Sequence, residues 1–205
     1  MNIVVNTALT PHGNDIGQHI VQAACQLITE QSFSGMSMRS LAKMVGLHAG
    51  SLYYHFPSKK DVLEEVMDHL HQQRLEAWRR EKGKHRTNRL KLEAFIRFNV
   101  HRQLYHASEE RLLKTEVCYL DPAQQLRVSE LEQAYTHELK AILTCGVKEG
   151  LFHQIDPEVM AHGILGITSC TVGLKQVRDL PEQHVGRLVS GMVSQLLSMP
   201  SESIQ

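Results

Sequence analysis

The most distinctive chemistry in the chain lies between positions 37 and 56, in the run SMRSLAKMVGLHAGSLYYHF. Two short segments with helical apolar spacing, 38–45 and 48–55, are joined at Gly46 and Leu47, which is the pattern of a helix-turn-helix. The second segment combines small and hydrogen-bonding residues, as suits a helix that approaches base edges in a DNA major groove. The same spacing also fits an ordinary helical corner with its tyrosines packed in a core.

The candidate DNA contacts fall into two groups. Residues expected to face the groove are His48, Ala49, Gly50, Ser51 and Tyr54, while Leu52 and Phe56 are expected to pack inward. Donors placed to reach phosphates are Arg39, Lys43, Lys59 and Lys60. Residues 1–60 hold four Lys or Arg against two Asp or Glu, so this part is mildly basic and its DNA binding is expected to depend on salt.

The composition is that of a soluble globular chain with one or two domains. Of 205 residues, 42% are apolar and 21% are charged, and 22 Lys or Arg balance 22 Asp or Glu. This balance excludes a polycation that coats nucleic acid non-specifically. Cys25, Cys118, Cys145 and Cys170 form no C-x-x-C pair, so we expect reduced thiols rather than disulfides or a cysteine zinc site.

No segment suggests export or membrane insertion. The first dozen residues lack the positive start and apolar run of a signal peptide, and the apolar stretch 158–174 is interrupted by polar residues and glycines. We therefore expect a cytoplasmic protein with no membrane partner.

Apolar residues recur every three or four positions after residue 15, which predicts an all-α fold. About nine helices are expected, a group of three followed by a larger bundle. Their predicted ranges are 15–31, 38–45, 48–55, 59–82, 88–106, 109–119, 122–149, 157–178 and 182–198. The first helix is expected to break at Phe33–Gly35.

Capping residues support several of these boundaries. Ser37 precedes the helix at 38–45, and Ser58 with Asp61 has the form of a capping box. Asp121-Pro122 and Asp156-Pro157 mark two further helix starts, because proline fits the first helical turn.

A longer motif gives the segment from Asn14 to Gln73 a family resemblance. Its elements are Ala23-Ala24, the Phe33–Met38 link, Arg39-x-Leu41-Ala42, Gly46-Leu47, Gly50-Ser51-Leu52-Tyr53-Tyr54-His55-Phe56 and Lys59-Lys60-Asp61-x-Leu63. Over these residues the chain resembles the N-terminal domain of TetR/AcrR transcriptional regulators. The resemblance implies a three-helix DNA-binding domain with a helix-turn-helix, followed by a helical ligand-binding and dimerisation bundle.

The resemblance also implies how the chain would meet DNA. Such regulators bind double-stranded operator DNA as homodimers, so a near-palindrome with half-sites about one turn apart or more is expected. Positions matching family contacts are Ser37, Arg39, Ala49, Gly50, Ser51, Tyr53, Tyr54, His55 and Lys59. His48 stands where many relatives carry Ser or Thr, which leaves its capping role and base preference open.

The resemblance implies three regions: a flexible tail at 1–13, a DNA-binding domain at 14–74 and a ligand-binding and dimerisation domain at 75–205. The last two helices are the expected dimer interface. Small residues there would allow close helix approach, although tight packing within one chain is the alternative; they are Gly163, Gly166, Ser169, Gly173, Gly186 and Gly191.

The bundle is expected to bind a small-molecule effector of unknown identity. Candidate lining residues, each also compatible with ordinary core or surface placement, are Trp78, Phe95, Phe98, Asn99, Arg102, Leu113, Glu116, Tyr119, Tyr135, Leu139, Ile142 and Thr168. Segment 111–135 resembles regulators of lipid degradation that sense acyl-CoA. The basic cluster at 79–91 is either a polyphosphate site or, more simply, a solvated loop.

The leading interpretation is a repressor released from DNA by its ligand. An adaptor that has lost operator binding and a transcriptional activator on the same fold are the alternatives. We expect no enzyme activity, cofactor or metal, because the H-E-x-x-H, P-loop, dinucleotide and G-x-S-x-G signatures are missing and the 13 histidines show no ligand spacing.

Overall fold

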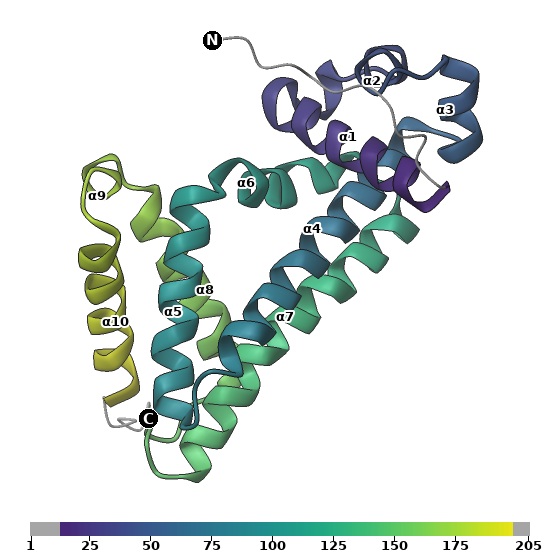
Figure 1. Cartoon of the computed structure of the whole chain (residues 1–205). Helices are drawn as coiled ribbons and strands as arrows, with labels where there is room; N and C mark the ends of the chain where they lie inside the picture. Colours follow the sequence, from purple (N-terminus) through teal and green to yellow (C-terminus); the bar gives the residue numbers. More distant parts are fainter. Residues whose placement is uncertain (1–12, 199–205) are drawn as a thin grey trace.

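The computed structural model describes residues 13–198, and this part of the chain is all-α, as predicted (Figure 1). The helices are α1 Gly13–Gly35, α2 Met38–Met44, α3 Ala49–His55, α4 Lys59–Lys82, α5 Asn88–Tyr105, α6 Ala107–Thr115, the 3-10 helix η1 Glu116–Tyr119, α7 Pro122–Lys148, α8 Pro157–Gly173, α9 Lys175–Arg178 and α10 Glu182–Ser198. Apart from Gly13, the predicted N-terminal tail lies outside the described residues.

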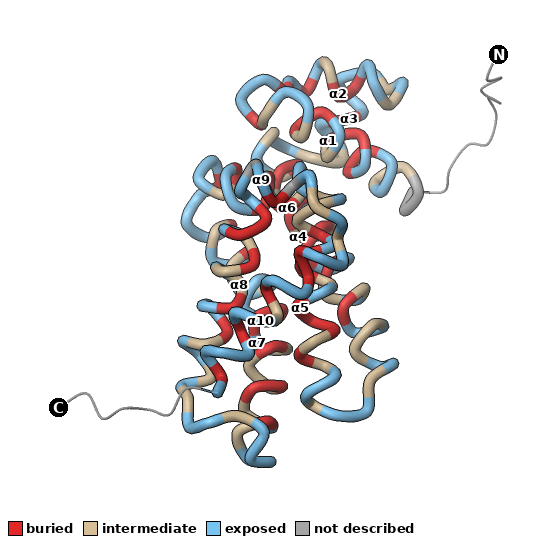
Figure 2. Tube along the Cα trace, turned by 90° about the vertical axis from the view of Figure 1, so that its left-hand side faces the viewer, coloured by how far each residue is buried: buried red, intermediate tan, exposed pale blue. Residues whose placement is uncertain are grey.

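Two hydrophobic cores organise these helices. The first joins α1, α2 and α3 to the N-terminal half of α4 and to apolar residues of α6 and α7, such as Leu112 and Val128. The second lies within α5, α7, α8 and α10 and includes Trp78 from the C-terminal half of α4. Figure 2 shows the buried residues of both parts running through the interior, with exposed residues on the outer helix faces.

Helix α4 belongs to both cores. It runs from the three-helix domain down the length of α7, and the two pack side by side (Figure 1). Val62, Leu63, Val66 and Met67 contribute to the first core and Trp78 to the second, all with no exposed surface. A displacement of this helix therefore disturbs the packing of both domains.

Most predicted boundaries are confirmed within two residues, and so are the caps. Ser37 and Ser40 form a capping box, Ser58 accepts from the Asp61 amide, and Asp121 with Gln124 caps α7. These contacts satisfy backbone donors that a helix start would otherwise leave unpaired.

Three predicted helices differ in detail. The first does not break at Phe33–Gly35 but is kinked at Ser32, which has φ of 64° and ψ of 166°. The helix predicted at 109–119 starts at Ala107 and tightens into η1 at Glu116, and the one at 157–178 is divided by extended backbone at Leu174. A local change of φ and ψ, such as that at Ser32 or Leu174, leaves no mark in the spacing of apolar residues.

Gly146 of α7 is the glycine whose replacement would crowd the core most directly. A Cβ there would lie 2.1 Å from Cε2 of Phe152, so the ring would have to move. We predict that Gly146→Ala lowers the free energy of unfolding by about 1–3 kcal/mol, measured by urea denaturation. Gly17→Ala is the control, because nothing lies within 4 Å of a Cβ at that position. Equal stability of the two variants would contradict the close packing of Gly146 against the Phe152 ring.

Asp68 of α4 predicts a pH-dependent stability. Burial, and then the neighbouring carboxylates of Glu65 and Glu64, raise the pKa of Asp68 from 3.8 to about 6, and its Oδ1 is buried without a hydrogen-bond partner. Ionisation of Asp68 therefore opposes folding above about pH 6, and the penalty disappears below its ordinary pKa.

We predict that Asp68→Asn raises the free energy of unfolding by about 1–2 kcal/mol at pH 8, with the gain shrinking toward pH 5. Urea denaturation at both pH values measures this, with exposed Asp179→Asn as the control. A gain in the free energy of unfolding that does not change with pH would contradict the raised pKa of Asp68.

Candidate DNA interface and the buried polar cluster of the bundle

The helix-turn-helix has the geometry that its sequence requires. Gly46 ends α2 with φ of 71°, a left-handed conformation that favours glycine. The Leu47 amide donates to the Ala42 carbonyl at 2.9 Å, which turns the chain toward α3. Buried Leu41 and Leu52, both with no exposed surface, hold the helix pair against the first core.

The opposite face of α3 is open. Tyr54 is 88% exposed and Tyr53 is 49% exposed, unusually high values for aromatic side chains. A Cβ at Gly50 would meet nothing within 4 Å, so the backbone there is accessible to a partner. The predicted contacts that are exposed are Ser37, Arg39, Lys43, His48, Ala49, Gly50, Ser51, Tyr53 and Tyr54. The fold thus gathers them at one end of the molecule.

Two predicted contacts are placed differently. His55 is half-buried, and its ring lies edge-on to Tyr54 at 5.7 Å between centroids. The Lys59 ammonium donates to the Ser34 carbonyl at 3.4 Å and lies 4.2 Å from the Phe33 ring centroid, and partial burial lowers the pKa of Lys59. Its cation is engaged with the end of α1, whereas Lys60 is exposed.

His48 is the N-cap of α3, but its side chain makes no capping hydrogen bond. The exposed imidazole is therefore free of an internal partner at the start of the helix, where a Ser or Thr would hold the first turn. This placement keeps His48 available for an external contact.

A joint between the two domains involves three residues that were predicted to line a ligand site. Glu116 accepts from the Phe33 amide at 3.3 Å, Tyr119 packs on the Phe33 ring at 5.0 Å between centroids, and Leu113 joins the first core. All three meet the DNA-binding domain. They are not brought together with the other candidates inside the bundle.

The remaining ligand candidates include an aromatic cluster. Trp78 meets Phe95 edge-on at 4.8 Å and Phe98 at 5.8 Å, and Phe95 stacks on Tyr135 at 5.4 Å. The Tyr135 hydroxyl donates to Asn99 at 3.1 Å. Leu139, Ile142 and Thr168 are also buried in the bundle.

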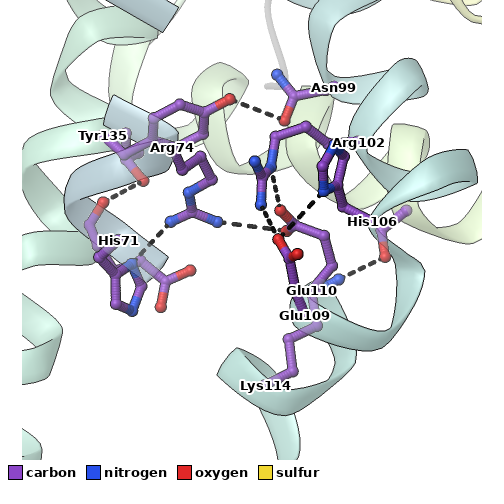
Figure 3. A network of polar contacts seen from close by, with 12 residues as sticks. His71, Arg74, Asn99, Arg102, His106, Glu109, Glu110, Lys114 and Tyr135 are labelled. Carbon is purple, nitrogen blue, oxygen red and sulfur yellow. Dashed lines mark hydrogen bonds and ion pairs between the residues drawn. The ribbon is translucent and has the colours of Figure 1, made fainter. Parts of the chain in front are cut away.

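Beside the aromatic cluster lies a buried ionic network that joins three helices (Figure 3). Glu110 of α6 accepts from Arg102 Nε of α5 at 2.5 Å and from Arg74 Nη1 of α4 at 3.4 Å. Arg102 also donates to Glu109 at 3.3 Å. The Arg74, Arg102 and Glu110 side chains are 6–9% exposed, so water does little to stabilise these charges.

His71 completes the network as a neutral partner. Its Nδ1 lies 3.0 Å from Arg74 Nη2, and burial together with the two nearby arginines lowers the pKa of His71 to about 3. A neutral imidazole that accepts at Nδ1 carries its proton on Nε2. That Nε2 is buried without a hydrogen-bond partner, as are Arg74 Nε and Trp78 Nε1.

Of the network residues, only Arg102 was predicted from sequence; Arg74, His71 and Glu110 were not. Positions 71, 74 and 78 share one face of a helix, so their spacing was a usable signal.

The basic cluster at 79–91 is largely paired. Arg79 and Lys82 both donate to Glu138, at 3.1 Å and 2.6 Å, and Lys84 donates to Glu81 at 2.6 Å. Arg80 and Arg86 are exposed. These contacts fit a structural and solvated segment better than a phosphate cradle.

The described residues contain neither a metal-ligand cluster nor a membrane-spanning helix. Between residues 13 and 198, no three His, Cys, Asp or Glu side chains are grouped as metal ligands. Within the same range no helix is long and apolar enough to cross a bilayer.

Comparison with known proteins matches both domains. Residues 20–66 match the family model of bacterial regulatory proteins of the tetR family, and residues 85–173 match the tetracyclin repressor-like C-terminal domain. The regulator AcrR of Shigella flexneri is 35% identical over 51 residues, which span 25% of this chain and 24% of AcrR. The repressor KstR2 of Rhodococcus jostii is 25% identical over 142 residues, or 68% of this chain and 70% of KstR2.

Solved structures agree in fold. AibR, determined with isovaleryl coenzyme A and operator DNA, superposes with a TM-score of 0.73 at 20% identity, covering 89% of this chain and 98% of AibR. FadR of Bacillus subtilis, determined with stearoyl-CoA, superposes with a TM-score of 0.73 at 21% identity, covering 88% and 97%. With family models matching both its DNA-binding and its C-terminal domain, the chain belongs to the TetR family of bacterial regulatory proteins.

Proposed function

We propose that this protein is a sequence-specific transcriptional repressor that binds operator DNA through α3. The observation that carries the proposal is the exposed face of α3, where Tyr53, Tyr54 and Ser51 stand beside the open backbone of Gly50. Exposed Arg39 and Lys43 on α2 supply donors for the phosphates on either side. We also propose that the DNA-binding domain spans residues 14–74 and that the ligand-binding and dimerisation domain spans residues 75–205.

The effector is proposed to bind in the helical bundle and to release the protein from DNA. Two structural neighbours were determined with coenzyme A thioesters, isovaleryl coenzyme A and stearoyl-CoA, which supports an acyl-CoA or another lipophilic effector here. We propose that the protein has no catalytic activity. We also propose that it acts in the cytoplasm, where its operator DNA would lie.

The active unit is proposed to be a homodimer formed by α8 and α10. Leu188, Met192 and Leu196 form an exposed apolar stripe on α10, each 38–43% exposed. Gly163, Gly166, Gly173 and Gly191 have nothing within 4 Å of a Cβ, so packing within the chain does not require them. Gly186 is different, because it is buried against Arg97.

An adaptor without operator binding and an activator are the competing functions. The retained donors on α2 and α3 favour DNA binding over the adaptor. Selection of genomic DNA fragments by the purified protein, at physiological salt, tests the proposal. Enrichment of one near-palindrome supports it, and no enrichment before or after unfolding and refolding to remove bound ligand would contradict it.

The double variant Arg39→Ala/Tyr54→Ala is predicted to lose most of its affinity for the selected fragment. Each lost contact is expected to raise Kd about tenfold or more, because both side chains are exposed on the proposed DNA face. Fluorescence anisotropy with labelled DNA measures the change. Arg80→Ala, which removes an exposed arginine outside the interface, is the matched control. Equal losses in the double variant and the control would refute the assignment of α3.

Met192→Glu is predicted to convert the dimer to a monomer, because it places a charge in the apolar stripe of α10. Light scattering coupled to size-exclusion chromatography measures the mass. Gln183→Glu on the same helix lies in the groove beside α5 and is expected to leave the dimer intact. A dimer that survives the Met192 change, or a wild-type monomer, would exclude this interface.

A further inference from the structure

The buried ionic network holds two guanidiniums but only one buried carboxylate. Arg74 and Arg102 share that of Glu110, while Glu109 is about one-third exposed and pairs with Arg102 and with His106. Arg74 is the less compensated cation, since its single ion pair measures 3.4 Å and the rest of its surroundings are the His71 ring nitrogen and the Tyr135 ring face at 4.2 Å. Arg74 therefore depends on the Glu110 carboxylate for its charge compensation, and any other carboxylate in that position would supply the same compensation.

Unpaired donors on α4 point to the same missing partner. The Nε2–H of His71, the Nε–H of Arg74 and the Nε1–H of Trp78 have no hydrogen-bond partner, and these three residues are 2%, 6% and 0% exposed. They recur at i, i+3 and i+7, so they share one face of the helix. Buried donors without acceptors are costly, and an oxygen-rich ligand would satisfy them.

Glu110 occupies the position that such a ligand would take. Its two oxygens lie between the two guanidiniums, so the space already accommodates a planar carboxylate (Figure 3). The same residue lines a surface pocket of about 320 Å³ between α5, α6 and α8. Arg111 and Lys114 also line that pocket and would receive the carboxylate of Glu110 if it swung outward.

We propose that Arg74 and Arg102 form a binding subsite for an organic carboxylate, which enters beside α6 and displaces Glu110. The inference rests on the proposed function, because it specifies the chemistry of the effector that binds the bundle. The apolar neighbours of the subsite are the Tyr135 ring, which faces Arg74 at 4.2 Å, and the Trp78 and Phe95 rings beside it. The charge of the network is unchanged, since one carboxylate replaces another.

Displacement of Glu110 would also transmit the effect of ligand binding to the DNA-binding domain. Leu112 and Leu113 of α6 pack in the first core, and Glu116 accepts the Phe33 amide at the kinked end of α1. The network anchors α6 to α4 and α5 through Glu110. Release of Glu110 therefore loosens α6 at the point where it supports α1.

The test is a titration of the full-length protein with acetate, hexanoate and decanoate, with decan-1-ol and decanoyl-CoA as comparison arms. Trp78 is the single tryptophan, so its fluorescence reports directly on the subsite. At least one carboxylate is expected to bind the wild type, and Glu110→Gln is expected to bind it about tenfold more tightly, because the competing carboxylate is gone. Glu76→Gln, which removes an exposed carboxylate of α4 outside the network, is the control and is expected to behave like the wild type.

Equal carboxylate affinity in Glu110→Gln, Glu76→Gln and the wild type would overturn the proposal. So would binding of decan-1-ol as tight as that of decanoate. If decanoyl-CoA binds and no free carboxylate does, the carboxylate subsite is excluded, but the proposal that the bundle binds an effector still stands. A failed DNA selection would contradict the proposed repressor function without affecting the result of these titrations.

A second measurement applies if Glu110→Gln does not fold stably. Propionate, which replaces the side chain removed in Glu110→Ala, is expected to raise the Tm of that variant more than equal concentrations of propionamide or chloride. Equal effects of propionate and propionamide would show that the two arginines do not take a carboxylate from solution.

Discussion

The structure depends on one helix that is shared by two cores. The N-terminal half of α4 packs with α1, α2 and α3, and its C-terminal half places Trp78 in the bundle. Between these halves, His71 and Arg74 interrupt the apolar packing with a charged network that reaches α5 and α6. Since close-packed interiors change between discrete arrangements, a displacement of this helix would alter both cores.

A regulator needs such a connection, because a ligand shifts DNA binding only if it stabilises one arrangement over another. Two contacts define the present arrangement at the domain joint: Glu110 with its two arginines, and Glu116 with the Phe33 amide. Both acceptors lie in the α6–η1 segment, and the kink at Ser32 adjoins the second contact. The positive φ of Ser32 is a strained conformation for a residue other than glycine, held by its neighbours.

The fold was largely predictable from sequence because helical periodicity, caps and the turn at Gly46 are local signals. The exposed DNA face was predictable for the same reason, because helix geometry alone places Leu52 on the buried face of α3 and Tyr54 on the exposed face. The buried network was not, because Arg74 and Glu110 are joined only by tertiary packing and charged residues are normally expected outside. Leu113 and Tyr119 were assigned to the bundle because spacing does not reveal which of two cores a helix face meets.

Amide hydrogen exchange of the protein, with and without a selected DNA fragment, is the sharpest test of DNA recognition by α3. We expect slower exchange in the helix-turn-helix at 37–56 on DNA binding, with the segment at 79–91 unchanged. Slower exchange confined to 79–91, with 37–56 unchanged, would contradict it.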